Sequence, residues 1–532
     1  MAATSSTRRP SVVKPPPDPA RLARGLAVAG LLGVVVVLAV CSFGQELSFD
    51  ESYNLQVVQH LLHGHRYATD GLLLPVGDSS EFDWRITTGP TMLLPVTAVA
   101  ALLGEHVWVY RLVPLAFFLL LVAGWFRLGR DLGGFWVGAA GAAAVLALDT
   151  ASATWGVSVY FGPGDVMGEA AAAGLVVLAA LNLRRPVRAG VLVGLAVLTK
   201  TVIVLMVPAV VVGVVWVARR SGVGRRVWLR FAGAALAPIG VWQVYRFAAA
   251  GPDRAQAANA KFVGFLIHGG SGIVQPDATT ITSWSKLTSQ APLLVPGPAV
   301  LALAVVALLL AVLLIGRRLA SSAPSEPGAP EAADRAPDRA ADRVPVLVLG
   351  SAGLLVELWY VLVSSQGWVR HSVTGSFLLF PALVVVTAAY VSKVGAPGRR
   401  ALLGTATAGL LGVTVGLHLA AALTFDGPDL AAQRRVAERV SEEPGGYMYA
   451  RHNRMADLML LGAPDPRPAD EGGGLVVLRH DGDSPNIFFD AQLAACSTVV
   501  FDLGGYTGCE LPPGPVPPAL ADHPLVAGDQ SG

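Results

Sequence analysis

The sequence contains little charge. Only 14% of its 532 residues are Asp, Glu, Lys or Arg, whereas 53% are hydrophobic. A soluble protein of this length carries about one quarter charged residues, so this composition argues against a soluble enzyme. Apolar runs of about 18 or more residues recur along the chain, which is the pattern of transmembrane helices. The sequence therefore predicts a polytopic α-helical membrane protein.

Other features are scarce or missing. The formal net charge is only +2, and no basic cluster lies beside interleaved aromatic residues, which excludes a nucleic-acid partner. The chain has three cysteines and neither a CxxC pair nor a zinc-ligand spacing. Two of them, Cys496 and Cys509, can pair if the C-terminal tail lies in an oxidising compartment. That tail contains no glycine motif for nucleotides in a fitting context.

Clusters of arginine and lysine flank the apolar runs and determine the expected topology. If every cluster is cytoplasmic, about eleven spans follow, with the N-terminus inside and the C-terminus outside. The expected spans lie near residues 25–43, 109–126, 133–152, 167–183, 187–199, 202–218, 230–248, 292–316, 345–363, 372–392 and 401–423. Together they make up a transmembrane domain over residues 25–423 in the plasma membrane.

One apolar segment, residues 89–104, does not fit this count. Its apolar part has about fourteen residues, which is short for a span. Counting it as a span would also move every later basic cluster to the outside. We therefore expect it to lie flat on the outer surface, within a large first outer loop over residues 44–108. Large structured loops often carry function.

The regions outside the spans differ in composition. Residues 1–24 are rich in proline and arginine and are expected to form a disordered cytoplasmic leader. Residues 319–343, rich in Ala, Pro, Asp and Arg, are expected to form a disordered cytoplasmic linker. Residues 424–532 instead combine an amphipathic helix pattern with short strand patterns, which predicts a small extracytoplasmic α/β domain. The helix pattern covers residues 429–440, and the strand patterns cover 446–450, 474–479 and 497–503.

The segments 187–199 and 202–218 are predicted to form a hairpin whose two ends are both cytoplasmic, with the sequence TKT at its tip. Each arm rises roughly 20–26 Å at about 1.5 Å per residue, less than the roughly 30 Å of a hydrocarbon core. Lys200 is therefore expected slightly below the outer surface, where a lysine is costly unless paired or hydrated. An anion in an outward-facing cavity fits this position, and the alternative is a lysine that extends to the headgroups.

Acids and cations from distant parts of the chain all fall at this outer level. An acid at the edge of a cavity can take a proton from an acceptor hydroxyl, and cations at this depth can hold a lipid phosphate as it leaves. The pattern favours transfer from a lipid-phosphate donor, and the alternative is a set of interfacial charges that are each satisfied locally. The candidate acids are Asp50, Glu51, Asp165 and Glu169, and the candidate phosphate ligands are Arg111, Lys200 and Arg370.

Five segments in residues 25–392 carry a resemblance to a known family. They are FDESYNLQVVQHLLHGHRY, VYRLVPLAFFLLLVAGWFRLGRDLGG, FGPGDVMGEA, GVLVGLAVLTKTVIVLMVPA and WVRHSVTGSFLLFPALVVV. In this order they resemble landmarks of the GT-C superfamily of membrane glycosyltransferases. The branch that looks most similar contains the protein O-mannosyltransferases and the aminoarabinose transferase of lipid A. The resemblance implies a GT-C-like fold and an inverting glycosyltransferase that uses a polyprenyl-phosphate sugar.

The resemblance also implies roles for individual residues. Asp50 matches the catalytic base of the family, Glu51 the second acid of the pair, and Asp165 the acid of the second outer loop. Lys200 and Arg370 match the region that meets the donor phosphate. The chain departs from the family in the segment HGHRY, where two glycines are usual, and in residues 249–291, which show no recognisable acceptor domain.

Three histidines, His60, His63 and His65, follow the acid pair. His60 and His63 are three residues apart on a predicted helix, so a divalent metal ion is one interpretation. Because no carboxylate or cysteine is placed beside them, we expect them instead to line the acceptor groove. Glu169 and His371 are candidates for the same groove or metal site, and His371 stands where the family usually has a tyrosine.

Two other functions remain open. A transporter or flippase of a lipid-linked glycan is expected to show internal repeats or charges at mid-membrane in broken helices, and we find neither pattern. A non-catalytic cell-wall assembly protein would have no need for an acid at position 50. The expected partners are the donor, membrane lipids and an acceptor that is a glycan, a lipid or a protein.

Overall fold

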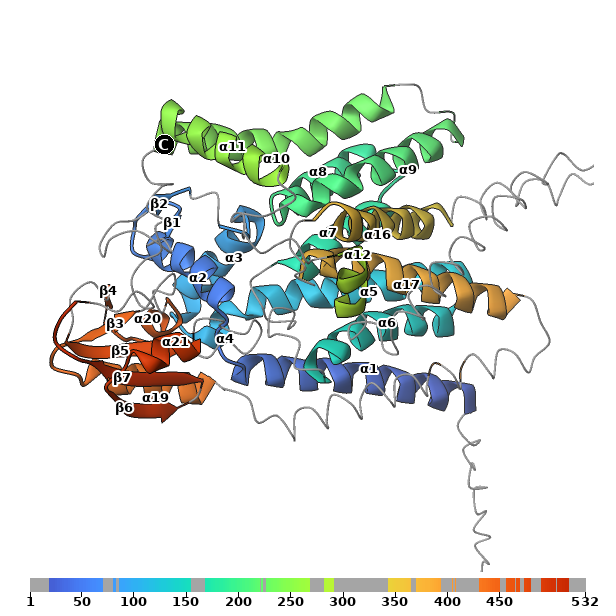
Figure 1. Cartoon of the computed structure of the whole chain (residues 1–532). Coiled ribbons are helices and arrows are strands. Elements are labelled where there is room, and N and C mark those ends of the chain that lie inside the picture. The colour runs from blue at the N-terminus through green and yellow to red at the C-terminus, as the bar shows by residue number, and fades with distance from the viewer. Residues whose placement is uncertain are drawn as a thin grey trace, which may run out of the picture.

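A computed structural model shows a bundle of long apolar helices with a small β-sheet domain at one end (Figure 1). The structure describes residues 19–69, 80–82, 86–154, 168–220, 222, 226–267, 282–290, 343–364, 370–393, 404, 407, 430–449, 456–464, 466–468, 473–479, 489–503 and 505–515. Within these ranges, the order of the elements follows the order predicted from hydropathy.

Most of the described residues before position 394 belong to the helical bundle. Its long elements are α1 (Pro19–Gly44), α5 (Leu112–Gly133), α6 (Phe135–Thr154), α7 (Glu169–Leu181), α8 (Pro186–Val197), the 3₁₀-helix η2 (Thr201–Met206), α9 (Val207–Arg220), α10 (Val227–Ala250), α16 (Val344–Leu362) and α17 (Arg370–Lys393). In the described part, six helical segments are long and apolar enough to cross a membrane: Arg21–Gly44, Val107–Gly133, Thr201–Arg220, Val227–Ala250, Val344–Leu362 and Ser372–Ser392.

The prediction of a helical membrane protein is therefore confirmed. The exact number of spans remains a prediction, because the expected spans at 292–316 and 401–423 lie almost wholly outside the described residues. The same is true of most of the leader over residues 1–24 and of the linker over residues 319–343. The side of the membrane on which each terminus lies also remains a prediction.

Glycines let several helices of the bundle approach closely, as is usual in membrane proteins. A Cβ atom at Gly194 of α8 would lie 2.2 Å from the carbonyl oxygen of Ala235 in α10. A Cβ atom at Gly353 of α16 would lie 2.7 Å from the carbonyl oxygen of Gly375 in α17. Larger residues at these two positions would push the paired helices apart.

The two ends of the bundle differ in chemistry. Successive helices reverse direction, so the end of α1 lies beside the start of α5, where Arg111 binds the carbonyl oxygen of Gln45. The start of α7 lies beside the turn after α8, where Glu169 meets Lys200. The basic residues at the ends of α5 and α9 therefore lie at the opposite end of the bundle from these contacts. This separation is the one that the charge pattern predicts.

The segment between α1 and α5 forms a compact unit at the first of these ends. It contains α2 (Phe49–Leu62), the short strands β1 (Ala68–Thr69) and β2 (Ser80–Glu81), α3 (Pro90–Leu103) and α4 (Val107–Tyr110). Met92, Leu93 and Val96 of α3 are buried in a core shared with α2, whereas Leu102 and Leu103 are exposed. The apolar stretch near 89–104 is thus a separate short helix, and its expected place flat on the outer surface remains a prediction.

The C-terminal domain is a mixed five-stranded sheet with the strand order β4-β3-β5-β7-β6. Strands β3, β4 and β5 are parallel, and β7 pairs antiparallel with both β5 and β6. Helices α19 and α20 share one core with the sheet, and α21 packs on a second core. The elements are α19 (Leu430–Ser441), β3 (Tyr447–Tyr449), α20 (Ala456–Leu460), β4 (Arg467–Pro468), β5 (Gly474–Arg479), α21 (Phe489–Ala494), β6 (Thr498–Leu503) and β7 (Tyr506–Leu511).

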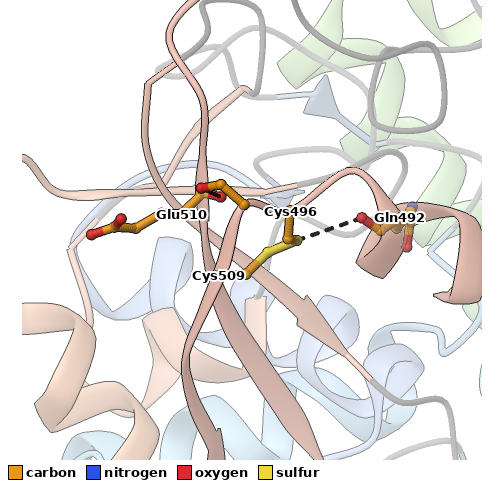
Figure 2. The surroundings of a disulfide bond; sticks show 5 residues. Gln492, Cys496, Cys509 and Glu510 are labelled. Atoms are coloured by element: carbon orange, nitrogen blue, oxygen red, sulfur yellow. Dashed lines mark hydrogen bonds between the residues drawn. A yellow bond between two sulfur atoms is a disulfide. The ribbon is translucent and has the colours of Figure 1, made fainter.

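The predicted amphipathic helix and all three predicted strands are present in this domain, as α19, β3, β5 and β6. The sequence pattern missed β4, which has two residues, and β7, whose sequence YTGCEL lacks a clear apolar alternation. A disulfide joins Cys496, just before β6, to Cys509 of β7, with a Cα–Cα distance of 5.7 Å (Figure 2). It links the segment between α21 and the edge strand β6 to the neighbouring strand β7.

The C-terminal domain rests on the unit formed by α2, α3 and α4 (Figure 1). Leu430 of α19 is buried in the same core as Leu55 and Val58 of α2, and Leu460 of α20 packs against that core. The last domain of the chain thus covers the helix that carries the acid pair.

Candidate active site

The acid pair lies in the first turn of α2, and a serine begins that helix. Ser48 has extended backbone angles, and its hydroxyl oxygen accepts a hydrogen bond from the backbone N–H of Glu51 at 3.1 Å. The spacing of Ser48 and Glu51 matches a capping box, in which the glutamate side chain would return to the cap residue. Here the side chain of Glu51 binds Arg111 instead of returning to Ser48. The two acids of the pair therefore have different surroundings.

Glu51 forms a buried two-point ion pair with Arg111, which lies between α4 and α5. The Glu51 carboxylate accepts from Nε of Arg111 at 2.9 Å and from Nη2 at 2.7 Å, and neither side chain is more than 2% exposed. The remaining guanidinium N–H groups donate to the carbonyl oxygens of Ser42, Gln45 and Glu46. An arginine has five N–H donors, and this arrangement gives an acceptor to each of them.

This geometry gives Arg111 a structural role that differs from the predicted contact with a donor phosphate. The guanidinium holds the end of α1, the start of α2 and the start of α5 at one point. Removing one partner of such a pair leaves a buried charge and costs about 3–5 kcal/mol. Glu51 and Arg111 therefore fix the position of the turn that carries Asp50.

Asp50 is the less buried acid of the pair. The residue is partly exposed, although its Oδ2 atom is buried, whereas Glu51 is 1% exposed. The backbone carbonyl of Asp50 accepts a hydrogen bond from the side-chain amide of Asn54 at 2.7 Å, one turn further along α2. Glu51 is enclosed by its contacts with Arg111, so Asp50 is the more exposed residue of the two.

A chain of hydrogen bonds connects the helix of Asp50 to the turn of Lys200. The side-chain oxygen of Asn54 accepts from the backbone N–H of Thr88 at 3.0 Å. The next N–H, that of Gly89, donates to the carbonyl oxygen of Thr199 at 2.9 Å. A Cβ atom at Gly89 would lie 1.8 Å from the carbonyl oxygen of Leu198, so only glycine allows this approach.

Lys200 lies at the tip of the α8–η2 hairpin, as the sequence predicts. Its ammonium group lies 2.8 Å from the carboxylate of Glu169, and the two side chains are 15% and 7% exposed. Glu169 begins α7 after Gly168, whose φ of +84° and close contact with Thr199 favour glycine. The lysine is thus paired within the chain, at the tip of the hairpin.

Three predicted site residues cannot be placed in this arrangement. Asp165 lies outside the described residues. Arg370 and His371 form the start of α17, but their side chains lie outside the described part of the structure. The predicted meeting of Arg370 with Lys200 at a donor phosphate therefore remains a prediction.

The three histidines lie at the end of α2 and just beyond it, on the surface. The rings of His60 and His65 lie edge to face with centroids 5.5 Å apart, and Nε2 of His63 is 3.5 Å from the carboxylate of Glu105. Among the described residues, no group of three or more His, Cys, Asp or Glu side chains could hold a metal ion. Because His63 and His65 are exposed, they can line a surface groove.

Sequence reasoning missed two polar groups in this region of the bundle. The first is Asn54. Its position one turn after an acid, at the start of a predicted interfacial helix, could have indicated its role. Glu357 was the other: it is buried between α16 and α17 and accepts from the hydroxyl of Ser376 at 2.7 Å. A single acid inside the apolar run VPVLVLGSAGLLVELWYVL was a usable signal, because such acids are rare in membrane helices.

Comparison with known proteins finds a similar overall fold. No protein-family model and no curated protein sequence matches the chain. The crystal structure of ArnT from Cupriavidus metallidurans in the apo state is similar, with a TM-score of 0.51 and 15% identity over 92% of this chain and 98% of that chain. The structure of the same ArnT bound to undecaprenyl phosphate gives a TM-score of 0.53 and 14% identity over 91% and 98%. The likeness shows a shared fold.

Proposed function

We propose that this chain is an inverting glycosyltransferase that moves a sugar from a polyprenyl-phosphate donor to an acceptor hydroxyl at the outer face of the plasma membrane. One observation carries the proposal above the others. The first turn of α2, which carries the partly exposed residue Asp50, is joined to the turn of Lys200 by hydrogen bonds that run through Asn54 and the segment Thr88–Gly89. In a single displacement reaction, the acid can take the proton of the acceptor hydroxyl, and the cation can stabilise the leaving phosphate.

The proposed step balances without a further reactant. Asp50 accepts the proton of the acceptor hydroxyl, and the hydroxyl oxygen attacks the anomeric carbon of the donor sugar. The bond between that carbon and the phosphate oxygen breaks, so the configuration inverts and polyprenyl phosphate leaves with its electron pair. Lys200 and Arg370 hold the phosphate and stabilise the charge that develops on it.

The other acids and Arg111 take supporting roles in this proposal. Glu51 and Arg111 position the turn of Asp50 and do not contact the substrates, because both side chains are buried. Glu169 keeps the ammonium group of Lys200 at the hairpin tip. Asp165, which precedes α7, remains a candidate for a second acid at the reaction centre.

The fold and the chemistry of the site both support a lipid-linked donor. ArnT in a structure of the same fold is bound to undecaprenyl phosphate, which is the product that our step would release. A lipid-linked donor also suits the outer face, where ATP and sugar nucleotides are absent. The acceptor is a glycan, a lipid or a protein, with the C-terminal domain on the outer side.

The test measures sugar transfer in membranes that contain the full chain. Radiolabelled polyprenyl-phosphate sugars are supplied, and label that leaves the polyprenyl phosphate for an acceptor is counted. Asp50→Asn should abolish transfer while leaving expression unchanged. Asp131→Asn is the matched control, because Asp131 is a half-exposed carboxylate in the last turn of α5, at the opposite end of the bundle. Transfer by Asp50→Asn at the wild-type rate would refute the assignment of the base.

The same assay separates the proposal from the two alternatives. A flippase would move the labelled donor across the membrane and leave its sugar attached. A wall-assembly protein without catalytic activity would bind a glycan and release no polyprenyl phosphate. Either result with the wild-type protein, in place of transfer, would refute a glycosyltransferase.

A further inference from the structure

We infer that the C-terminal domain acts as a positioning element for Asp50, through a clamp formed by Gln433 and Arg479 on the backbone of Leu47. The inference rests on the proposed function only in taking Asp50 as the reacting acid. The clamp itself consists of hydrogen bonds between parts of the chain 386 and 432 residues apart.

The contacts of the clamp involve both backbone groups of Leu47. Its N–H donates to the side-chain oxygen of Gln433 at 2.7 Å, and its carbonyl oxygen accepts from the side-chain nitrogen of Gln433 at 3.0 Å. Nη2 of Arg479 donates to the same carbonyl oxygen at 3.2 Å. Leu47 and Gln433 are both fully buried, so water cannot replace these bonds. A primary amide that binds both backbone groups of one residue fixes its orientation as well as its place.

The side chains of the clamp are themselves held by a buried polar network. The carboxylate of Asp457 accepts from Nη1 of Arg479 at 3.0 Å and from the hydroxyl of Tyr506. Burial raises the pKa of Tyr506 well above its ordinary value, so its hydroxyl stays protonated and can donate. The amide of Gln433 also donates toward the oxygen of Tyr506 at 2.8 Å. Four elements of the domain, α19, α20, β5 and β7, therefore support one contact with the first outer loop.

The membrane domain holds the same short segment from its other side. Arg111 binds the carbonyl oxygens of Gln45 and Glu46, while Arg479 lies 3.4 Å from the side chain of Glu46. Residues 42–47 are thus held by contacts with both the helical bundle and the C-terminal domain. Since Leu47 directly precedes the cap residue of α2, its orientation sets the direction in which α2 begins.

The position of the clamp explains why it would affect the reaction and not only the stability of the domain. Burial of Leu430 and Leu55 in a shared core already docks the two parts on each other. The polar clamp adds control of the backbone three residues before Asp50, and Asn54 controls the backbone after it. Displacing a reacting group by about 1 Å can cost on the order of 10²-fold in rate. The donor contacts at Lys200 lie on other elements and would be unaffected.

The experiment uses the full-length protein purified in detergent and replaces Gln433 by methionine. Gln433→Met keeps the volume of the side chain and removes both hydrogen bonds to Leu47. We expect kcat for transfer to fall on the order of 10²-fold, with the KM for the polyprenyl-phosphate sugar changed by less than about twofold. Glu438→Met is the matched control on an exposed position of the same helix, and it should leave both constants unchanged. A folded Gln433→Met protein with the kcat of the wild type would overturn the inference.

A second measurement does not depend on activity. Hydrogen exchange of the peptide that spans residues 45–52 should be at least about tenfold faster in Gln433→Met than in the wild type, because the N–H of Leu47 loses its acceptor. Unchanged protection would overturn the clamp even if activity fell. If the wild-type protein transfers no sugar, the proposed function fails, and hydrogen exchange still decides whether the domain fixes the start of α2.

Discussion

Glu51 and Arg111, 60 residues apart in the chain, form a two-point ion pair in which neither side chain is more than 2% exposed. This pair divides the roles of two adjacent acids. Glu51 holds the turn through Arg111, and Asp50 is the acid to which our proposal assigns the reaction. The two adjacent acids thus differ in burial and in surroundings, because only Glu51 faces a buried arginine.

The first prediction concerns this division of roles. Glu51→Ala should lower the free energy of unfolding by about 3–5 kcal/mol, because it leaves the charge of Arg111 buried without its carboxylate. Asp50→Asn should change stability by less than about 1 kcal/mol, as expected for a partly exposed side chain. Thermal unfolding of the two variants in detergent, beside the wild type, measures the difference. Equal stabilities for Glu51→Ala and Asp50→Asn would contradict the assigned roles.

The second prediction concerns the link between α2 and the hairpin tip. Gly89→Ala places a methyl group within van der Waals overlap of the carbonyl of Leu198, where Cβ would lie at 1.8 Å. We expect a loss of stability of about 1–3 kcal/mol or more and a loss of transfer, since the Asp50 and Lys200 elements must separate. Gly240→Ala is the control, because no heavy atom lies within 4 Å of its Cβ position. A Gly89→Ala protein as stable and active as Gly240→Ala would show that the two elements do not need this contact.

The third prediction concerns the donor phosphate. Lys200→Met should raise the KM for a polyprenyl-phosphate sugar by about tenfold or more, because a charge-assisted hydrogen bond contributes about 1.5–3 kcal/mol. Glu169→Gln should raise this KM by less, since it leaves the ammonium group of Lys200 in place. Lys393→Met, at the far end of α17, serves as the control for lysine removal. The measurement is initial-rate kinetics with varied donor, and an unchanged KM in Lys200→Met would remove Lys200 from the donor site.

The fourth prediction concerns the disulfide of the C-terminal domain. The bond between Cys496 and Cys509 closes a loop with a sequence separation of 13, and for loops of about this size its removal costs about 3 kcal/mol. Reduction with a thiol reagent should therefore lower the melting temperature of the purified protein. The double variant Cys496→Ser with Cys509→Ser should melt at the temperature of the reduced wild type and should not respond to the reagent. A wild-type protein whose melting temperature is the same with and without reductant would argue against the bond.

Much of the fold followed from local patterns in the sequence. The helical spans, the hairpin tip at Lys200 and strands β3, β5 and β6 each follow from runs of fewer than thirty residues, in which hydropathy and charge decide the outcome. The partners within the site could not be found in this way. Arg111 was expected at a donor phosphate, whereas the structure buries it against Glu51. Likewise, the pairing of Gln433 with Leu47 joins residues 386 apart, and no local pattern marks either of them.

The clamp on Leu47 has a consequence for the making of the protein. Leu47 and Asp50 belong to the first loop of the chain, whereas Gln433 and Arg479 follow α17 and are synthesised only after that helix. A membrane-inserted intermediate that lacks residues 430–511 would contain the acid and the helical bundle but not the element that sets the start of α2. Asp50 would then reach the position seen in the structure only after the C-terminal domain has been synthesised and has folded onto α2.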